Sequence, residues 1–288
     1  MKQLSPYQFH QLLQSGEALD SHAVTEAQLN GFNLSKKTLD SFDFSNSVLT
    51  NLRAYGTKAN HSKWTNAVMT YANCPSMTAI DSDFTGINAM YSNLCNANLS
   101  FSNFSQANLG YARLHRSNLQ HSIFDGAELS ECDLTLADLT GATMTNVKTS
   151  STLNVSGAKL RFVQMIDSTL ILLDAETADL SHANLDDCYL HMAFFNHATL
   201  NYAKFQMASI TESDFTEASV IQADFTLAHI SDCDFSGADL TGSIFLSATL
   251  QNITTDDKTC FRNANFDCAK IADDDKIKIM NAGGILEA

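Results

Sequence analysis

Residues 97–114 read ANLSFSNFSQANLGYARL, and one pattern recurs in them every five positions. Large apolar residues stand at Leu99, Phe104, Leu109 and Leu114, and a small residue stands two positions before each. An amphipathic helix needs an apolar spacing near 3.6 and a simple strand a spacing of about 2, so five fits neither. The spacing predicts a chain that turns a corner at every pentapeptide and closes a square coil with every fourth one.

This pattern extends over most of the chain. Large apolar residues recur at every fifth position from Phe84 to Met144, with Ala89 as the exception. The series resumes from Val155 to Leu250, moved by one residue, with Ala175 as the exception. At residues 87–89 and 173–175 the large and small residues trade places. Both positions are therefore predicted to point inward at a roughly constant total volume, and the residue between them to point outward.

Two longer regularities predict four pentapeptides in each coil. Tyr71, Tyr91 and Tyr111 are spaced by twenty and stand at the same place in their pentapeptides. Every second centre from Phe195 to Phe245 is Phe, and the centres between are aliphatic. In a square coil this places the Phe side chains on two opposite walls.

The repeated segments resemble the pentapeptide-repeat family, whose consensus is A(D/N)LXX. Ala97-Asn98-Leu99, Ala178-Asp179-Leu180 and Ala238-Asp239-Leu240 match it. The resemblance implies an all-β protein, a right-handed quadrilateral β-helix. The square coil follows from the spacing, whereas the handedness comes from the resemblance.

We expect four regions along the chain. Residues 1–25 form an N-terminal capping helix and a lead-in, and residues 26–81 form imperfect pentapeptide coils. Residues 82–250 form the regular solenoid, with a one-residue register slip near 145–154, and residues 251–288 form the last coils and a C-terminal capping helix. Phe32, Lys37 and Phe42 occupy positions where a small residue is expected, which predicts distorted coils there.

Both ends carry helix signals. Ser5 and Pro6 read as an N-cap and a first helical residue, and Gly16 as the stop, so residues 6–15 are predicted to cover the first coil. Asp273-Asp274-Asp275 followed by residues 276–281 predicts a short terminal helix. The apolar residues Ile277, Met280, Ile285 and Leu286 are expected either to close the solenoid or to form a homodimer contact.

Charge and composition narrow the function classes. The net charge of −15 disfavours direct binding to nucleic acid or to an anionic membrane. The N-terminus lacks the apolar run of a signal peptide, and no apolar stretch is long enough for a membrane span. Seven cysteines without CxxC spacing favour free thiols in the cytoplasm, with secretion without a cleaved signal, as an effector, as the alternative.

No motif for catalysis, a metal or a cofactor is found. HExxH, GxSxG, a P-loop and GxGxxG are all absent, and the nine histidines are scattered. Cys132, Cys188 and Cys233 occupy the small inward position and are interpreted as core thiols, whereas Cys95 and Cys268 are expected to be more exposed. These observations favour a protein that is not an enzyme.

An acidic surface is the first candidate binding site. Residues 1–120 carry seven acidic and eight basic side chains, whereas residues 121–288 carry 25 and 9, a net charge of −16. Outward positions of one wall and its corners hold the six carboxylates that we call the acidic wall: Asp174, Glu176, Asp214, Glu217, Asp232 and Asp234. Phe194 interrupts their column. The alternative interpretation is that Asp is the preferred polar residue before each centre, wherever it lies.

The tyrosine column is the second candidate surface. Tyr71, Tyr91 and Tyr111 lie near Arg113, and exposed Tyr and Arg are favoured in protein interfaces. The alternative interpretation is that stacked tyrosines stabilise the coils.

The sequence therefore predicts a protein-binding solenoid. It resembles the quinolone-resistance branch of the family, whose members are acidic DNA mimics that bind type II topoisomerases, gyrase and topoisomerase IV. The alternative function is that of a bacterial secreted effector or adaptor that uses the solenoid as a scaffold for protein interaction or localisation.

Overall fold

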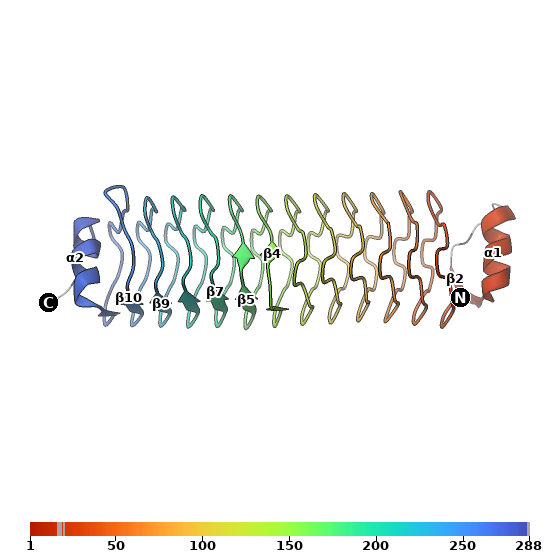
Figure 1. Ribbon diagram of the computed structural model, residues 1–288, viewed down its shortest axis with the longest axis horizontal. Helices are drawn as coiled ribbons and strands as arrows, with labels where there is room; N and C mark the ends of the chain where they lie inside the picture. The colour runs from red at the N-terminus through yellow and green to blue at the C-terminus, as the bar shows by residue number, and fades with distance from the viewer. Residues whose placement is uncertain (16–18, 20, 287–288) are drawn as a thin grey trace. The chain divides into compact units, whose positions relative to one another are not determined.

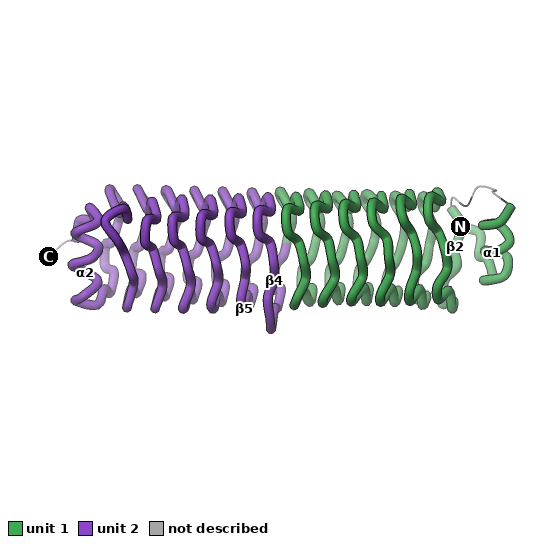
Figure 2. The backbone as a smooth tube through the Cα atoms, turned by 45° about the horizontal axis from the view of Figure 1, so that its top comes forward, with its two compact units in different colours: residues 1–143 green, residues 144–288 purple. Residues whose placement is uncertain are grey.

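The computed structural model describes residues 1–15, 19 and 21–286, in two compact units, Met1–Thr143 and Met144–Ala288 (Figure 2). Unit 1 contains β1 (Lys2–Gln3), α1 (Pro6–Ser15) and β2 (His22–Ala23). Unit 2 contains β3 (Lys148–Thr149), β4 (Leu153–Asn154), β5 (Thr169–Ile171), β6 (Leu173–Asp174), β7 (Tyr189–His191), β8 (Ser209–Thr211), β9 (His229–Ser231), β10 (Thr249–Gln251), β11 (Lys270–Ile271) and α2 (Asp273–Asn281). Short parallel β-bridges hold most of the remaining chain.

Each unit is a right-handed quadrilateral β-helix, as the sequence predicts. Parallel bridges join residues twenty positions apart, as in the series Asn73, Asn93 and Arg113 of unit 1. In unit 2, β5, β7, β8, β9 and β10 pair side by side in one parallel sheet. Figure 1 shows the stacked coils, with α1 beside the first coil of unit 1 and α2 beside the last coil of unit 2.

A β-turn forms each corner of the coil. The carbonyl of Leu94 accepts a hydrogen bond from the Ala97 amide at 3.1 Å, and Asn96 within the turn has φ of 58°. Positive φ recurs at every fifth residue, where Asn, Asp and Gly are the residues that tolerate it best. An Asn or Asp before the centre often accepts a further hydrogen bond at the corner: Asn98 Oδ1 accepts from the Ser100 amide at 3.3 Å, an Asx-turn.

The predicted inward residues form the core. Leu99, Leu119, Phe215 and Phe235 are fully buried, whereas Asp214 and the other residues before the centres face outward. Phe195, Phe215 and Phe235 stack at 4.9 and 5.0 Å, and Phe205, Phe225 and Phe245 form the same kind of column on the opposite wall. At residues 87–89 and 173–175 both exchanged side chains are buried, which confirms that both positions point inward.

Helix α1 covers the first coil of unit 1. Ser5 Oγ accepts the Gln8 amide while Gln8 Oε1 accepts the Ser5 amide, so a capping box begins the helix. The large residues at small positions face this helix: Phe9 packs on Phe42 at 5.2 Å, and Lys37 Nζ donates to the Leu13 carbonyl at 2.8 Å. The bridge ladder continues regularly through these coils, which corrects the expectation that they are distorted. The stop predicted at Gly16 lies outside the described residues.

The register of unit 2 changes by one residue at two places. Lys148 pairs with Thr169, 21 positions on, whereas Leu153 pairs with Leu173, 20 positions on, so the extra residue lies between β3 and β4. Asp234 pairs with Thr254, 20 positions on, whereas Asp239 pairs with Cys260, 21 positions on. A second extra residue therefore lies between Thr254 and Cys260.

Helix α2 closes the last coil of unit 2 through residues other than the predicted ones. Ile279 is buried, and Lys278 Nζ donates to the Ile253 carbonyl at 2.7 Å. Ile277 and Met280 remain exposed, which corrects the expectation that they close the solenoid. The part of the chain that the structure describes contains no helix long and apolar enough to cross a membrane.

Candidate functional site: the acidic wall of unit 2

Outward positions on successive coils bring the predicted carboxylates together. The bridges Asp174–Phe194, Phe194–Asp214 and Asp214–Asp234 form one column, with the ring of Phe194 between two carboxylates. Neighbouring coils in a parallel ladder lie about 4.8 Å apart, so the negative charges of Asp214 and Asp234 repel each other.

Each of the three aspartates uses one oxygen for the fold. The Oδ1 atoms of Asp174, Asp214 and Asp234 accept the amides of the residues two positions on, at 3.3, 2.7 and 2.8 Å. Within residues 1–15, 19 and 21–286, no hydrogen bond or ion pair reaches their Oδ2 atoms. One oxygen of each carboxylate is therefore available to a partner, and the negative charge is uncompensated.

Two aspartates on the other walls of unit 2 are partly compensated. Asp179 Oδ2 lies 4.0 Å from Arg161 Nε, and Asp224 Oδ2 accepts Gln206 Nε2 at 2.6 Å. Partial burial favours a higher pKa for Asp224, but hydrogen bonds from Thr226 and Gln206 and the charge of Lys204 together hold its pKa below the ordinary value. Asp239, on another wall, resembles the acidic-wall aspartates, since the printed hydrogen bonds of its carboxylate involve Oδ1 alone. The acidic wall differs in that two such aspartates, Asp214 and Asp234, follow each other on successive coils.

The corners beside this column carry the remaining predicted acids. Asp232 lies at a positive-φ corner and accepts Asn252 Nδ2 at 3.1 Å. Glu217 lies at the opposite corner, where Oε2 is 3.2 Å from His197 Nδ1. Glu176 is exposed, and Glu212, which shares the corner column of Asp232, extends the negative surface.

The acids have apolar neighbours that the sequence analysis did not identify, apart from Phe194. Tyr189 and Met192 are exposed in the same coil as Phe194. The five-residue register contains the signal that finds Tyr189, because a large apolar residue there occupies an outward position.

The second predicted surface is a stacked ladder in unit 1. The rings of Tyr71 and Tyr91 lie 4.9 Å apart, as do those of Tyr91 and Tyr111, with interplanar angles of 6° and 14°. Arg113 is exposed on the adjoining wall and pairs with Asn93 in the bridge ladder. The tyrosines cover one another's faces and present ring edges and hydroxyls outward.

The cysteines at small inward positions are core thiols. Burial raises the pKa of Cys188 and Cys233 to about 12 and raises that of Cys132 as well, so these thiols stay protonated near neutral pH. Cys268 is exposed as predicted, but the expectation for Cys95 is wrong, because its side chain is buried.

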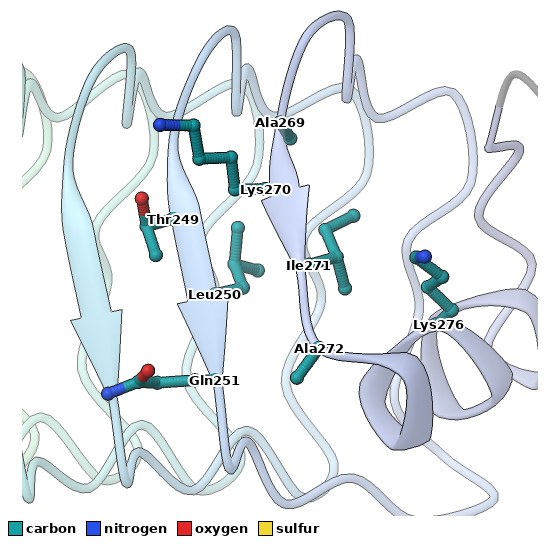
Figure 3. Close-up of a pocket in the computed structure, with 8 residues that line it drawn as sticks. All are labelled: Thr249, Leu250, Gln251, Ala269, Lys270, Ile271, Ala272 and Lys276. Carbon is teal, nitrogen blue, oxygen red and sulfur yellow. The ribbon is translucent and has the colours of Figure 1, made fainter.

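Four hollows formed by described residues are lined by residues other than the predicted acids. Figure 3 shows the pocket where β10 and β11 meet the start of α2, lined by Leu250, Ile271 and Lys276 among others. In the described part of the chain, His, Cys, Asp and Glu form no cluster of three or more that is suited to a metal ion. The acidic wall lies outside these hollows.

Stacked coils of this geometry define a repeat scaffold, and comparison with known proteins identifies its family. Residues 57–134 match a model described as "Pentapeptide repeat region", and residues 178–216 and 208–245 match "Pentapeptide repeats (8 copies)". Together these matches cover just over half of the chain. The chain belongs to the pentapeptide-repeat family.

Several solved structures are similar to this chain. HetL, a pentapeptide-repeat protein involved in heterocyst differentiation regulation from the cyanobacterium Nostoc sp. strain PCC 7120, is 20% identical, with 93% of this chain and 94% of that chain covered and a TM-score of 0.28. Full-length QnrB1, a plasmid-mediated fluoroquinolone resistance protein, is 16% identical over 74% of this chain and all of its own, with a TM-score of 0.32. Rfr23 from the cyanobacterium Cyanothece 51142 is 18% identical over 46% and 90%, with a TM-score of 0.20. No curated protein matches the sequence.

Proposed function

We propose that this chain is a non-enzymatic protein-binding scaffold and that its acidic wall binds a basic protein surface. One observation carries the proposal: Asp174, Asp214 and Asp234 each have one oxygen satisfied by the turn and a second oxygen without a partner in the described residues. Lys and Arg side chains are the complementary groups, and such surface attraction mainly accelerates association.

A DNA-accepting protein is the partner class that we propose, specifically a bacterial type II topoisomerase, gyrase or topoisomerase IV. A column of carboxylates that repeats with each coil offers regularly spaced negative charge to a surface built for phosphates. This partner lies in the bacterial cytoplasm, the compartment that the sequence predicts.

The test exploits the hydrogen bond of each aspartate. Asn keeps the Oδ1 acceptor and removes the charge, so a variant with Asp174→Asn, Asp214→Asn and Asp234→Asn retains the turns. A matched control changes Asp167, Asp187 and Asp239 to Asn, which removes the same charge from other surfaces of unit 2. In a gyrase supercoiling assay, the wild type and the control are expected to inhibit, and the acidic-wall variant to inhibit much less.

Equal inhibition by both variants rejects the acidic wall as the binding surface. If the wild type neither binds nor affects gyrase or topoisomerase IV at micromolar concentration, the topoisomerase proposal fails. The effector or adaptor function then takes precedence, with the Tyr71, Tyr91 and Tyr111 ladder and Arg113 as the first surface to alter.

We further propose that α2 contributes a homodimer contact. Ile277 and Met280 are 58% and 52% exposed on this helix, although Ile279 beside them is buried. Changing Ile277 and Met280 to Lys is expected to shift the protein from dimer to monomer in light scattering. A wild type that is monomeric at every concentration tested rejects this contact.

A further inference from the structure

Phe194 lacks a hydrogen bond that its nearest neighbours in the column make. In the two coils before Phe194 and the two coils after it, the residue at this position accepts a hydrogen bond from the backbone amide two positions on. The acceptors are the Oδ1 atoms of Asn154, Asp174, Asp214 and Asp234, at 3.0, 3.3, 2.7 and 2.8 Å. A phenyl ring has no acceptor, so Phe194 cannot make this bond. The fold thus loses a brace at this turn.

Packing within the described residues does not compensate for the loss. Other exposed rings stack on neighbouring coils, as Phe162 does on His182 at 4.9 Å and His182 on Tyr202 at 4.9 Å. The ring of Phe194 stacks on no other described ring, and the residue is 41% exposed. Phe162 and Tyr202 are exposed to a similar extent, at 49% and 50%, but the ring faces of Phe194 are not covered by another described ring.

Phe194 has apolar neighbours around one corner of its coil, with Met192 at the corner and Tyr189 on the adjoining wall. Tyr189 and Met192, in the same coil, are 42% and 39% exposed, and Leu172 precedes Met192 by one coil in the same corner column. We call Leu172, Tyr189, Met192 and Phe194 the Phe194 patch. Exposed apolar side chains that gather in this way, rather than singly, mark interaction surfaces.

Charged residues border this patch directly. Glu212 and Asp214 follow Met192 and Phe194 in the next coil, and Asp232 and Asp234 follow in the coil after that. At about 4.8 Å for each coil, the carboxylates lie roughly 5 and 10 Å from the patch along the axis of unit 2. An apolar side chain, Phe194, is thus followed along the axis of unit 2 by negative charge on each of the next two coils.

We infer that the Phe194 patch and the acidic wall together bind one amphipathic basic helix of a protein partner, with an apolar side chain on the patch and Lys or Arg side chains beside Asp214 and Asp234. An α-helix presents positions i, i+4 and i+7 on one face, separated by about 6 and 10.5 Å, which matches the coil spacing. The inference rests on the proposed function and adds to it the element that the partner contributes.

The apolar contact also supplies selectivity. A basic surface that recognises only phosphates has no apolar group to place on Phe194. When such a surface binds the acidic wall, the Phe194 patch stays exposed to solvent. Central apolar anchors surrounded by polar groups carry much of the binding free energy in protein interfaces. The patch therefore favours basic partners that carry an apolar residue in the matching position over those with charge alone.

Two synthetic helical peptides of identical composition serve as probes. One carries Leu at i with Lys at i+4 and i+7, and the other has the same residues in scrambled order. Phe194→Asn restores the acceptor of the column and removes the ring. Leu227→Asn is the matched control, because Leu227 is 55% exposed at a corner of another wall, with φ of 61°, where Asn is tolerated.

Fluorescence anisotropy with the full chain gives the affinities. Phe194→Asn is expected to weaken binding of the patterned peptide about tenfold, equivalent to about 1.4 kcal/mol, and to leave the weaker binding of the scrambled peptide unchanged. Leu227→Asn is expected to change neither. The Asp214→Asn, Asp234→Asn variant is expected to weaken binding of both peptides.

The outcomes separate this inference from the proposed function. If the aspartate variant weakens binding but Phe194→Asn does not, the acidic wall stands and the apolar anchor is rejected. An equal effect of Phe194→Asn and Leu227→Asn also rejects it. If the wild type does not prefer the patterned peptide over the scrambled one, the helix geometry is wrong, and if no variant changes binding, the acidic wall fails as well.

Discussion

Unit 1 and unit 2 build the same turn with different charge. In unit 1 the outward position before the centre is often Asn, and Asn93, Asn98 and Asn103 accept the amide two residues on at 3.1, 3.3 and 2.9 Å. In unit 2, Asp214 and Asp234 make the same bond at 2.7 and 2.8 Å. Asn and Asp make the same bond at this position, so the bond does not require a charge. The charge of the acidic wall is therefore available for function without being required for folding.

The core provides the largest expected effect, and it should be similar in both units. Phe104 in unit 1 and Phe215 in unit 2 are fully buried in phenylalanine columns. Phe104→Ala and Phe215→Ala are each expected to lower the free energy of unfolding by about 3–5 kcal/mol, because a cavity remains. Urea denaturation measures both. A loss below about 1 kcal/mol in either unit means that its core is packed differently.

The exchanged pentapeptides should show compensation. Leu173 and Ala175 are both fully buried and share one layer of unit 2. Ala175→Leu alone is expected to overpack the layer and cost about 1–3 kcal/mol, whereas Leu173→Ala combined with Ala175→Leu should recover most of that loss. Equal urea midpoints for the single and double variants contradict the idea that the two positions share one volume.

The acceptor and the charge can be separated at one residue. Asp214→Asn keeps the hydrogen bond to the Thr216 amide and is expected to change the free energy of unfolding by less than about 0.5 kcal/mol. Asp214→Leu removes the acceptor and is expected to cost about 0.5–1.5 kcal/mol. If the Asn variant is as unstable as the Leu variant, Asn does not replace Asp as the acceptor at this position, and the proposed equivalence of the two units is wrong.

The smallest expected effect is a pH dependence. Partial burial opposes ionisation of Asp83 and Asp224, but hydrogen bonds and a nearby lysine leave the pKa of each below the ordinary value of 3.8. A carboxylate whose pKa is lower in the folded state stabilises the fold above its unfolded pKa, and this contribution is lost as pH falls through the folded value. Thermal melts below pH 4 should therefore show a smaller acid-induced loss of stability in Asp83→Asn and Asp224→Asn than in the wild type. An identical acid response in all three proteins contradicts this assignment.

The five-residue periodicity predicts the β-helix because every pentapeptide has the same local geometry. It does not predict contacts that occur at a single place in the chain, such as those with the terminal helices. Phe42 and Lys37 violate the repeat because they meet α1, and Ile279 rather than Ile277 closes the last coil because helix rotation is set by packing. For the candidate site, the register places Asp214 and Asp234 outward, but which carboxylates are compensated depends on neighbours such as Arg161 and Gln206.

The most direct test of the central claim is the affinity for gyrase as a function of salt, measured for the wild type and for the variant with Asp174, Asp214 and Asp234 changed to Asn. Exposed charges are screened beyond about 8 Å at physiological ionic strength. The account predicts equal urea midpoints for the two proteins, weaker binding by the variant, and a less steep loss of affinity with salt. Equal affinity and equal salt dependence would show that the acidic wall contributes nothing to binding.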